Sequence, residues 1–396
     1  MGSTFQLTVG DIEVWGGTNY LPSDVLLPFQ KSDLRQTVMD NLPTLHEYRV
    51  DARTVALRLE LLGYSMARVR RAYAFGVEAL DAFERERWPN HLVCRDGFDQ
   101  WCRTILATAR AVQEGRTGDP VDDHPPHWEE TLLGFPGGDL GEVLRALVEV
   151  VPDDTSVTLD LTDLIVGGWL SADPALSEGR MPLIILTEGK SDSRLLSAAL
   201  GTLHSQLTDF VRFIDYETAN PQGGTSQLVQ FVKMFVGCGI PNRIVVLFDN
   251  DAAGHEALAA LPGLRLPENV RVTCLPSLPS FASYPTDGPD GRRLSDIDGR
   301  ACAIELYLGK EALTGEDGER RPIRWTGFNA KMQRYQGEVV GKDEIQKRFA
   351  ENLSEVGVGR AKREQFDFTG VEAIFEHVFA VLAEDSDARR ARRRTT

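Results

Sequence analysis

The chain has 396 residues, of which 42% are hydrophobic, and 59 acidic against 43 basic residues give it a net charge of −16. This length accommodates two or three domains with separate cores. The charge argues against a protein that coats nucleic acid, because phosphate neutralisation needs clustered Lys and Arg. Basic residues do gather locally in 67–71, 320–334 and 389–394, so a basic groove on an acidic body stays open.

Membrane, secretory and disulfide-rich classes are disfavoured. No run approaches the roughly 18 to 20 apolar residues of a membrane helix. The first residues lack the basic start and apolar core of a signal peptide. The five cysteines are scattered without a C-x-x-C spacing, which argues against a zinc site or a disulfide framework. We expect a soluble, cytoplasmic protein with no membrane partner.

The first part of the chain indicates mainly helices. Residues 5–21 alternate around a Gly-Gly pair, which predicts a β-hairpin. From 52 to 114, apolar residues recur at three- and four-residue spacing, which predicts helices. A further helix is expected over 141–151, and strand or mixed apolar structure over 155–170. We therefore predict a mostly helical N-terminal domain, residues 1–178, that starts with a β-hairpin.

From residue 179 to 396 the pattern changes to alternating strands and helices. Short, continuous apolar runs of this kind are typical of parallel strands buried on both faces. The pattern predicts an α/β domain with an open, mostly parallel sheet and helices on both faces. The expected strands are 182–189, 243–249 and 270–275, and the expected helices are 191–203, capped by Ser191, and 221–239 after a glycine turn.

Acidic residues follow two of these strands. Glu188 ends the first strand, and Asp249 ends the second. Because ligands of such sheets bind beyond the carboxyl ends of the strands, both acids are expected at one edge. Asp251 lies two residues further on and points the same way if the strand continues. Crowded carboxylates raise one another's pKa unless a cation neutralises them, and Mg²⁺ prefers oxygen ligands. A magnesium site is therefore predicted.

These motifs resemble the Toprim domain: TEGKSD at 187–192 is followed by FDNDAAG at 248–254. Toprim domains occur in topoisomerases, bacterial primases, recombination proteins and nucleases of the OLD (overcoming lysogenisation defect) family. The resemblance implies that Glu188 acts as general acid or base or as a metal ligand, and that Asp249 and Asp251 bind Mg²⁺ or Mn²⁺. No strand-breakage domain and no zinc ribbon is recognisable, which favours a nuclease over a topoisomerase or primase.

Further residues match OLD-like nucleases. Asp192 stands at the spacing of an extra acid that serves a second metal ion in that family, and Glu305 is the candidate for its downstream acid. For the lysine of that family the candidate is Lys342, with Lys331 as reserve. Two metal ions suit phosphodiester hydrolysis, and a lysine offsets transition-state charge. Structural alternatives remain: a first-turn helix acid for Asp192, a solvated helix acid for Glu305 and a surface lysine for Lys342.

The front of the chain, residues 5–35, resembles the HEPN/Toprim-associated N-terminal domain of bacterial conflict and anti-phage proteins. The resemblance implies a defence nuclease whose front domain senses, oligomerises or docks a partner. It does not imply a HEPN ribonuclease. That catalysis needs Arg and His on one helix, and Pro89 interrupts the helix between Arg85 and His91.

The sequence leaves substrate and partners partly open. The expected substrate is nucleic acid, with DNA favoured over RNA, and the expected assembly is a homo-oligomer. No Walker P-loop occurs, so an ATPase or sensor would be a separate protein. A haloacid-dehalogenase phosphatase also carries D-x-D after a strand, although Ala253 and the TEG strand argue against it. A catalytically silent Toprim scaffold, or a nucleic-acid-binding subunit of a defence complex, remains the alternative.

Overall fold

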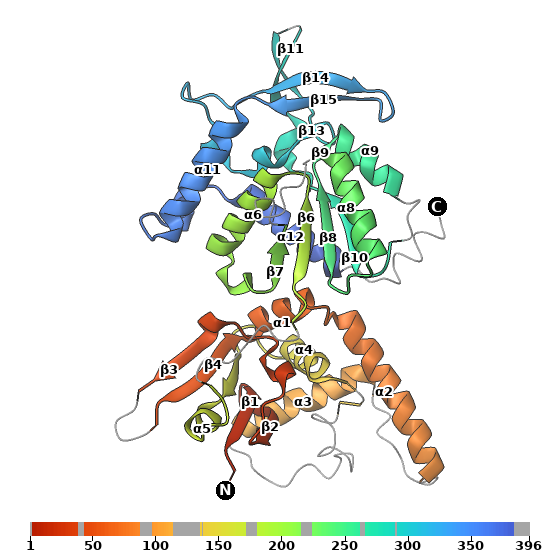
Figure 1. Ribbon diagram of the computed structural model, residues 1–396, viewed down its shortest axis with the longest axis vertical. Helices are drawn as coiled ribbons and strands as arrows, with labels where there is room; N and C mark the ends of the chain where they lie inside the picture. The colour runs from red at the N-terminus through yellow and green to blue at the C-terminus, as the bar shows by residue number, and fades with distance from the viewer. Residues whose placement is uncertain are drawn as a thin grey trace. The chain divides into compact units, whose positions relative to one another are not determined.

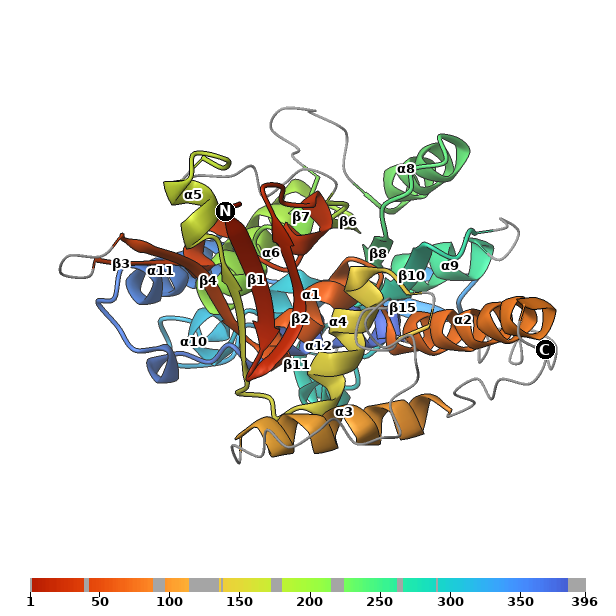
Figure 2. The ribbon, with the colours of Figure 1, turned by 90° about the horizontal axis from the view of Figure 1, so that it is seen from below.

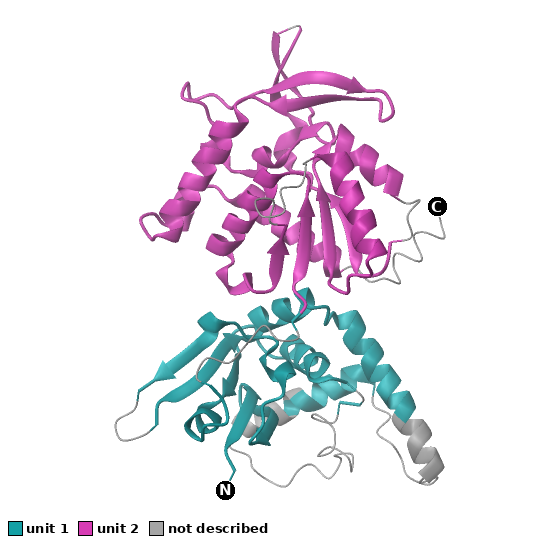
Figure 3. Ribbon diagram, in the orientation of Figure 1, with its two compact units in different colours: residues 1–180 teal, residues 181–396 magenta. Residues whose placement is uncertain are grey.

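The computed structural model describes residues 2–38, 43–87, 97–113, 135–136, 138–171, 180–214, 224–261, 266–289 and 291–383. The chain forms two compact units, unit 1 with residues 1–180 and unit 2 with residues 181–396 (Figure 3). The predicted boundary between 178 and 179 falls within 172–179, outside the described residues. Among the described residues, no helix combines the length and the apolar character needed to cross a membrane.

Unit 1 contains a five-stranded antiparallel sheet with the order β2-β1-β5-β4-β3, and β3, β4, β1 and β2 can be followed across it in Figure 2. The strands are β1 (Thr4–Val9), β2 (Ile12–Thr18), β3 (Leu34–Thr37), β4 (Leu45–Asp51) and β5 (Ser156–Asp160). The helices are α1 (Ala52–Leu61), α2 (Met66–Arg87), α3 (Phe98–Gln113), α4 (Leu140–Val150), α5 (Thr162–Val166) and the 3₁₀ turns η1 (Ser23–Leu26) and η2 (Lys31–Asp33). Helix α4 contacts α1, α2 and α3.

The predicted hairpin is confirmed as β1 and β2, but its turn lies elsewhere. Val9 pairs with Ile12, so Gly10 and Asp11 make the turn, with Gly10 at a φ of 56°. The Gly-Gly pair lies inside β2, where a Cβ on Gly17 would come within 2.6 Å of the Phe5 ring. Gly17 therefore makes room for an aromatic side chain rather than a turn.

A mostly helical domain is not confirmed, because helices and a five-stranded sheet share unit 1. The predicted helical region does contain α1, α2 and α3, and the helix predicted over 141–151 is α4. Strand β3 is an edge strand with three of its four residues exposed. Such a strand lacks the apolar alternation by which strands are recognised in a sequence.

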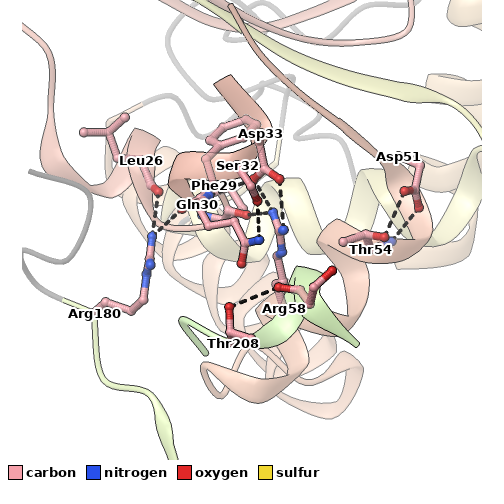
Figure 4. Close-up of polar contacts among 12 residues, drawn as sticks. Leu26, Phe29, Gln30, Ser32, Asp33, Asp51, Thr54, Arg58, Arg180 and Thr208 are labelled. Atoms are coloured by element: carbon pink, nitrogen blue, oxygen red, sulfur yellow. Dashed lines mark hydrogen bonds and ion pairs between the residues drawn. The ribbon is translucent and has the colours of Figure 1, made fainter. Parts of the chain in front are cut away.

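A buried ion pair connects η2 with α1 in unit 1 (Figure 4). The Arg58 side chain is fully buried, and its guanidinium donates to both carboxylate oxygens of Asp33, at 2.6 and 3.1 Å. It also donates to the carbonyl of Pro28 at 2.9 Å. The Gln30 backbone N–H donates to Asp33 at 2.7 Å. Each charge thus has several partners, as a buried charge requires.

Unit 2 is built on a four-stranded sheet with the order β10-β8-β6-β7, in which each neighbouring pair is parallel. This confirms the predicted parallel sheet. Its strands are β6 (Leu183–Thr187), β7 (Val211–Phe213), β8 (Ile244–Phe248) and β10 (Val270–Cys274). The surrounding helices are α6 (Lys190–Leu203), α8 (Thr225–Gly237), α9 (Ala252–Ala260), α12 (Thr369–Ala383) and the 3₁₀ turns η4 (Ser205–Leu207), η6 (Pro279–Ala282) and η8 (Arg363–Gln365).

The strand order reverses between β6 and β8. From β6 the chain passes through α6 to β7 on one side, and from β8 through α9 to β10 on the other. Alternate residues of β8, among them Val246 and Phe248, pack in one cluster with Leu228 of α8 and Leu261 after α9. Right-handed crossovers place α6 on the opposite face. The carboxyl ends of β6 and β8 thus border the crevice where such sheets bind ligands.

Further elements lie beyond that edge, near the top of Figure 1. The short strand β9 (Asn250–Asp251) pairs with β13 (Ala301–Cys302). A mixed sheet has the order β12-β11-β14-β15. Its strands are β11 (Tyr284–Gly288), β12 (Gly291–Ser295), β14 (Ile323–Asn329) and β15 (Arg334–Val339), and the nearby helices are η7 (Ile304–Tyr307), α10 (Lys310–Leu313) and α11 (Lys342–Gly357).

Candidate active site

Glu188 and Asp249 meet at the carboxyl edge of the parallel sheet. Their strands are neighbours, with Thr187 of β6 paired with Leu247 of β8. The backbone N–H of Asp249 donates to Oε1 of Glu188 at 3.0 Å. Two acids 61 residues apart in sequence are therefore joined by one hydrogen bond. The ends of the two strands thus lie side by side, as the sequence predicted.

The start of α8 fixes the position of Glu188. The Thr225 hydroxyl donates to Oε2 of Glu188 at 2.6 Å, and the Gly224 N–H donates to the Glu188 carbonyl at 2.8 Å. Burial raises the pKa of Glu188, whereas the hydrogen bonds from the Thr225 hydroxyl and the Asp249 N–H lower it; the charge of Asp251 raises it again, and the net change is a rise. Glu188 is held in one orientation by groups from two other elements.

Asp251 caps helix α9. Its Oδ1 accepts the backbone N–H of Gly254 at 2.7 Å, and its own backbone lies in β9, paired with Ala301. A Cβ on Gly254 would stand 2.2 Å from the Asp249 carbonyl oxygen. Since real Cβ atoms do not approach so closely, only glycine allows α9 to start against the end of β8. This contact holds Asp251 beside Asp249.

Asp192 lies in the first turn of α6 and faces the same cluster. Its carboxylate accepts the Gly189 backbone N–H at 2.9 Å and the Ser191 hydroxyl at 3.1 Å. Helix α6 begins at Lys190, so Ser191 is not the cap that the sequence predicted, and the Asp192 carboxylate binds the N–H of the residue before the helix instead. Burial raises the pKa of Asp192 to about 6, with repulsion from Glu305 as the next cause.

The electrostatics of Asp249 bring the whole set together. Burial raises the pKa of Asp249 well above its ordinary value. Four other carboxylates raise it further by repulsion, in decreasing order those of Asp192, Glu188, Asp251 and Glu305. Among the described residues, none donates a hydrogen bond to the Asp249 carboxylate. We call these five residues the carboxylate cluster.

Glu305 belongs to this cluster and is not a solvated helix acid. It lies in the 3₁₀ turn η7 and is only 4% exposed. Its Oε1 accepts from Gln346 of α11 at 2.8 Å, whereas its Oε2 is buried without a hydrogen-bond partner among the described residues. A buried carboxylate oxygen without a donor is costly unless something else compensates it. The orphaned oxygen therefore suits a cation or a hydrogen-bond donor from outside these residues.

The first turn of α11 carries the nearest cation among the candidate residues. Lys342 forms an ion pair with Glu338 at 3.4 Å. Burial alone lowers the pKa of Lys342, but three nearby carboxylates raise it above the ordinary value: those of Glu305, Glu338 and Asp249. Lys331, by contrast, is exposed and pairs with Glu256 at 2.7 Å. Of the two predicted lysines, only Lys342 interacts electrostatically with the cluster.

The donor set suits a hard divalent cation, because all five groups are carboxylates. The orphaned oxygen of Glu305 and the raised pKa values of Asp192 and Asp249 are consistent with a cation. The side chains are not assembled as a closed coordination shell, however. Within the described part of the chain, no three His, Cys, Asp or Glu side chains converge closely enough to hold an ion. A cation would have to draw the carboxylates together.

Three polar residues of the site were not singled out in the sequence. Thr225 follows the glycine pair before α8, a position that often contacts anionic groups at a helix start. Gln346 lies one turn after Lys342 on the same helix face, which was a usable signal. Asn250 is buried between His255 and Asp298, at 2.8 Å from each. Its distant partner Asp298 could not be inferred from local sequence.

Arg85 and His91, which the sequence argued against as a HEPN ribonuclease pair, are only partly covered. Arg85 lies near the end of α2, which ends at Arg87, and His91 lies outside the described residues.

Comparison with known proteins informs mainly unit 1. The family model of the HEPN/Toprim N-terminal domain 1 matches residues 1–180, the same range as unit 1. This match shows that residues 1–180 are similar to a HEPN/Toprim-associated N-terminal domain. No curated protein and no solved structure matches it.

Proposed function

We propose that the chain is a metal-dependent nuclease that hydrolyses phosphodiester bonds in nucleic acid, with DNA favoured over RNA, and that it acts in bacterial anti-phage defence or conflict. The matched N-terminal domain is named after HEPN and Toprim proteins, which hints at a nuclease-type function. The observation that carries the proposal is the hydrogen bond between the Asp249 N–H and Glu188 at the point where the strand order reverses.

The cluster residues would divide the work. Asp249 and Asp251, with Glu188, would hold one Mg²⁺ or Mn²⁺ ion, and Asp192 with Glu305 would hold a second. Such ions activate water and stabilise the departing oxygen of a phosphodiester. Their charge would also relieve the repulsion that raises the pKa values of Asp192 and Asp249.

Lys342 would act on the substrate rather than on the ions. Its ammonium lies within the field of Glu305 and Asp249 and stays protonated. A positive charge at this place would attract the scissile phosphate toward the acids and offset negative charge in the transition state. Gln346, one turn further along α11, would keep Glu305 oriented.

A catalytically silent scaffold is the second candidate. Both oxygens of Glu188 already accept hydrogen bonds, and one oxygen of Asp251 caps α9. If these bonds are permanent, the cluster would serve only to shape a nucleic-acid-binding subunit of a defence complex. The raised pKa values argue for the enzyme, because a purely structural cluster gains nothing from mutual repulsion.

Cleavage assays test the proposal directly. The purified full chain is incubated with plasmid, linear and single-stranded DNA and with RNA, with Mg²⁺, with Mn²⁺ and with a chelator. We expect cleavage only with metal, and at least a hundredfold loss in Asp249→Asn. The control Glu316→Gln changes an exposed acid outside the cluster and should cleave normally. Metal-independent cleavage, or full activity of Asp249→Asn, would contradict the proposal.

Metal binding has a readout that does not need activity. Adding Mn²⁺ at about 100 times its dissociation constant should raise the free energy of unfolding by about 2.7 kcal/mol. The variant Glu188→Gln/Asp249→Asn should show no such increase, because it lacks two central carboxylates. Equal stabilisation of both proteins would place the ion elsewhere and would favour the silent scaffold.

A further inference from the structure

The mixed sheet of unit 2 carries three aromatic rings joined by contacts to Tyr335, of which Phe328 and Tyr335 are exposed and Trp325 is partly buried. The rings of Phe328 and Tyr335 have centroids 5.3 Å apart, and those of Trp325 and Tyr335 are 6.0 Å apart. Phe328 is 53% exposed and Tyr335 is 61% exposed. Single exposed apolar side chains are common on protein surfaces, whereas a contiguous apolar patch marks a binding surface. We call these three residues the aromatic face.

The pairing of β14 and β15 puts the three rings on one side of the sheet. Phe328 lies directly opposite Tyr335, and Trp325 lies opposite Gly337, two residues along β15. Gly337 has little free space: a Cβ there would come within 3.0 Å of the Trp325 ring. The glycine therefore lets the indole lie across the neighbouring strand, where its ring reaches Tyr335.

The opposite side of the same strands fastens the hairpin to the body of unit 2. Asn329 and Arg334 form the next pair, so their side chains point away from the aromatic face. Asn329 donates to Glu256 of α9 at 2.8 Å, and Arg334 donates to the carbonyl of Gly299 at 3.1 Å. These bonds hold the end of the hairpin on the body of unit 2 and leave Phe328 and Tyr335 exposed. Nearer the other end, Ile323 and Val339 lie on the same side as the rings and are buried.

This attachment places the aromatic face close to the carboxylate cluster. Helix α9 starts immediately after Asp251, and Glu256 lies five residues later, about 7 Å along the helix axis. Strand β13, which pairs with Asp251, also contacts β15. In Figure 1, β14 and β15 lie beyond β9 and β13, on the side of the edge where β8 ends. A chain bound along the hairpin would reach the cluster within a few nucleotides.

The charge of the mixed sheet differs from that of the whole chain. Its four strands contain four arginines and two acids, whereas the chain has a net charge of −16. Arg293 is exposed, and its pairing with Thr286 puts it on the side of the aromatic face. The other three arginines, Arg292, Arg324 and Arg334, lie on the opposite side by the same pairing. Aromatic rings on the same side as one exposed arginine suit a ligand with flat bases and a negative backbone.

We propose that the aromatic face binds an unpaired strand of nucleic acid by stacking its bases on Trp325, Phe328 and Tyr335. This inference rests on the proposed nuclease function and specifies its substrate as single-stranded or locally unpaired. In a duplex the faces of the bases are already stacked on one another, so the rings have little to bind. Stacking tolerates any base, so the surface would hold substrate without sequence preference.

Binding assays in the presence of a chelator test the inference without requiring hydrolysis. Fluorescence anisotropy of labelled probes is measured with the full chain and with Trp325→Leu/Phe328→Leu/Tyr335→Leu, which keeps apolar bulk but removes the rings. We expect at least a tenfold weaker affinity for a single-stranded oligonucleotide. The affinity for an oligomer of the same backbone without bases should change less than twofold.

Two control variants separate stacking from damage to the fold. Tyr20→Leu removes a ring of unit 1 that is 71% exposed and should bind normally. The conservative variant Trp325→Phe/Tyr335→Phe keeps rings at both positions and should retain most of the affinity. If it loses affinity as fully as the leucine variant, or if the backbone without bases loses affinity equally, the stacking surface is overturned.

The remaining outcomes distinguish this inference from the proposed function. Metal-dependent cleavage together with unchanged oligonucleotide binding by the leucine variant overturns the stacking surface alone. The expected loss of binding in a chain that cleaves nothing supports the stacking surface and contradicts the nuclease. Equal loss of duplex binding, or a change in oligomeric state caused by the leucine variant, would assign the rings to another partner and overturn the inference.

Discussion

Buried charged side chains have opposite surroundings in the two units: an opposite charge in unit 1 and like charges in unit 2. In unit 1, Arg58 and Asp33 satisfy each other through two hydrogen bonds, and backbone groups supply the rest. In unit 2, five carboxylates crowd one edge of a sheet, and one oxygen of Glu305 has no hydrogen-bond partner within the described residues. In the first arrangement opposite charges and backbone groups compensate each other, whereas in the second like charges lie close together.

This difference separates a structural charge from a functional one. A paired buried charge keeps the fold in one arrangement, and removing either member leaves the other unpaired. Crowded like charges weaken the fold and are expected where a ligand supplies the opposite sign. Replacing one charged group at a time should therefore have opposite effects in the two units.

The largest effect is expected for the ion pair of unit 1. Arg58→Met should lower the free energy of unfolding by about 3–5 kcal/mol, because it leaves Asp33 buried without its cation. Chemical denaturation measures the change. Arg58→Met/Asp33→Leu should recover most of the loss, since neither charge then remains. A loss below about 1 kcal/mol in the single variant would show that Asp33 is satisfied by other groups.

A smaller effect of opposite sign is expected for Asp192. Its pKa of about 6 in the folded chain exceeds the unfolded value of about 3.9, so the folded state binds the proton more tightly. Stability without metal is therefore lost as the pH rises from about 4 to 6 and stays low above that. Asp192→Asn should be more stable than the parent by about 3 kcal/mol at pH 7 and nearly equal to it at pH 4.

Denaturation of both proteins at the two pH values, in chelator, measures this difference and cancels the background titration. If Asp192→Asn were less stable than the parent at pH 7, the prediction would be wrong. The stabilisation from the hydrogen bond of Asp192 to Gly189 would then exceed the destabilisation from burial and from neighbouring carboxylates.

The smallest effect concerns a paired acid of unit 2. Glu372 of α12 bonds His204 at 2.6 Å and also pairs with Arg363. Burial alone raises the pKa of Glu372, but the bond and charge of His204 and the charge of Arg363 lower it overall. Its contribution to stability is therefore present above the unfolded pKa and is lost as the pH falls through the lowered value.

Glu372→Gln should accordingly reduce the free energy of unfolding by up to about 1 kcal/mol at pH 7 and leave it unchanged near pH 3. Thermal denaturation at both pH values tests this. If Glu372→Gln were more stable than the parent at pH 7, Glu372 would behave like the crowded acid Asp192. The contrast between paired and crowded acids would then fail.

Patterns of local sequence were sufficient for three of the four strands of the parallel sheet of unit 2, and the three-residue strand β7 was not predicted. Strands β6, β8 and β10 are apolar runs with acids or turns after them, and the rule for strand ends then placed Glu188 beside Asp249. The involvement of Asp192 and Glu305 came only from a resemblance. Their proximity to Asp249 depends on how α6 and η7 pack, which no local pattern specifies.

Strand β3 of unit 1 and the mixed sheet of unit 2 were not predicted, for a common reason. Three of the four residues of β3 are exposed, and β12 is exposed along most of its length, so neither shows a clear alternation. The aromatic face was missed too, because Trp325 and Tyr335 become neighbours only through the register of β14 and β15. Pairing between strands is information that a single stretch of sequence does not contain.

Gly254 has a consequence for how related chains should be judged. The helix start that it permits is a steric requirement of the backbone and would persist in a descendant that had lost all catalysis. A glycine at this place therefore reports that the turn is intact, whereas Glu188, Asp249 and Asp251 report on chemistry. In a survey of relatives, a retained glycine beside altered acids would mark an inactive copy with an undamaged framework.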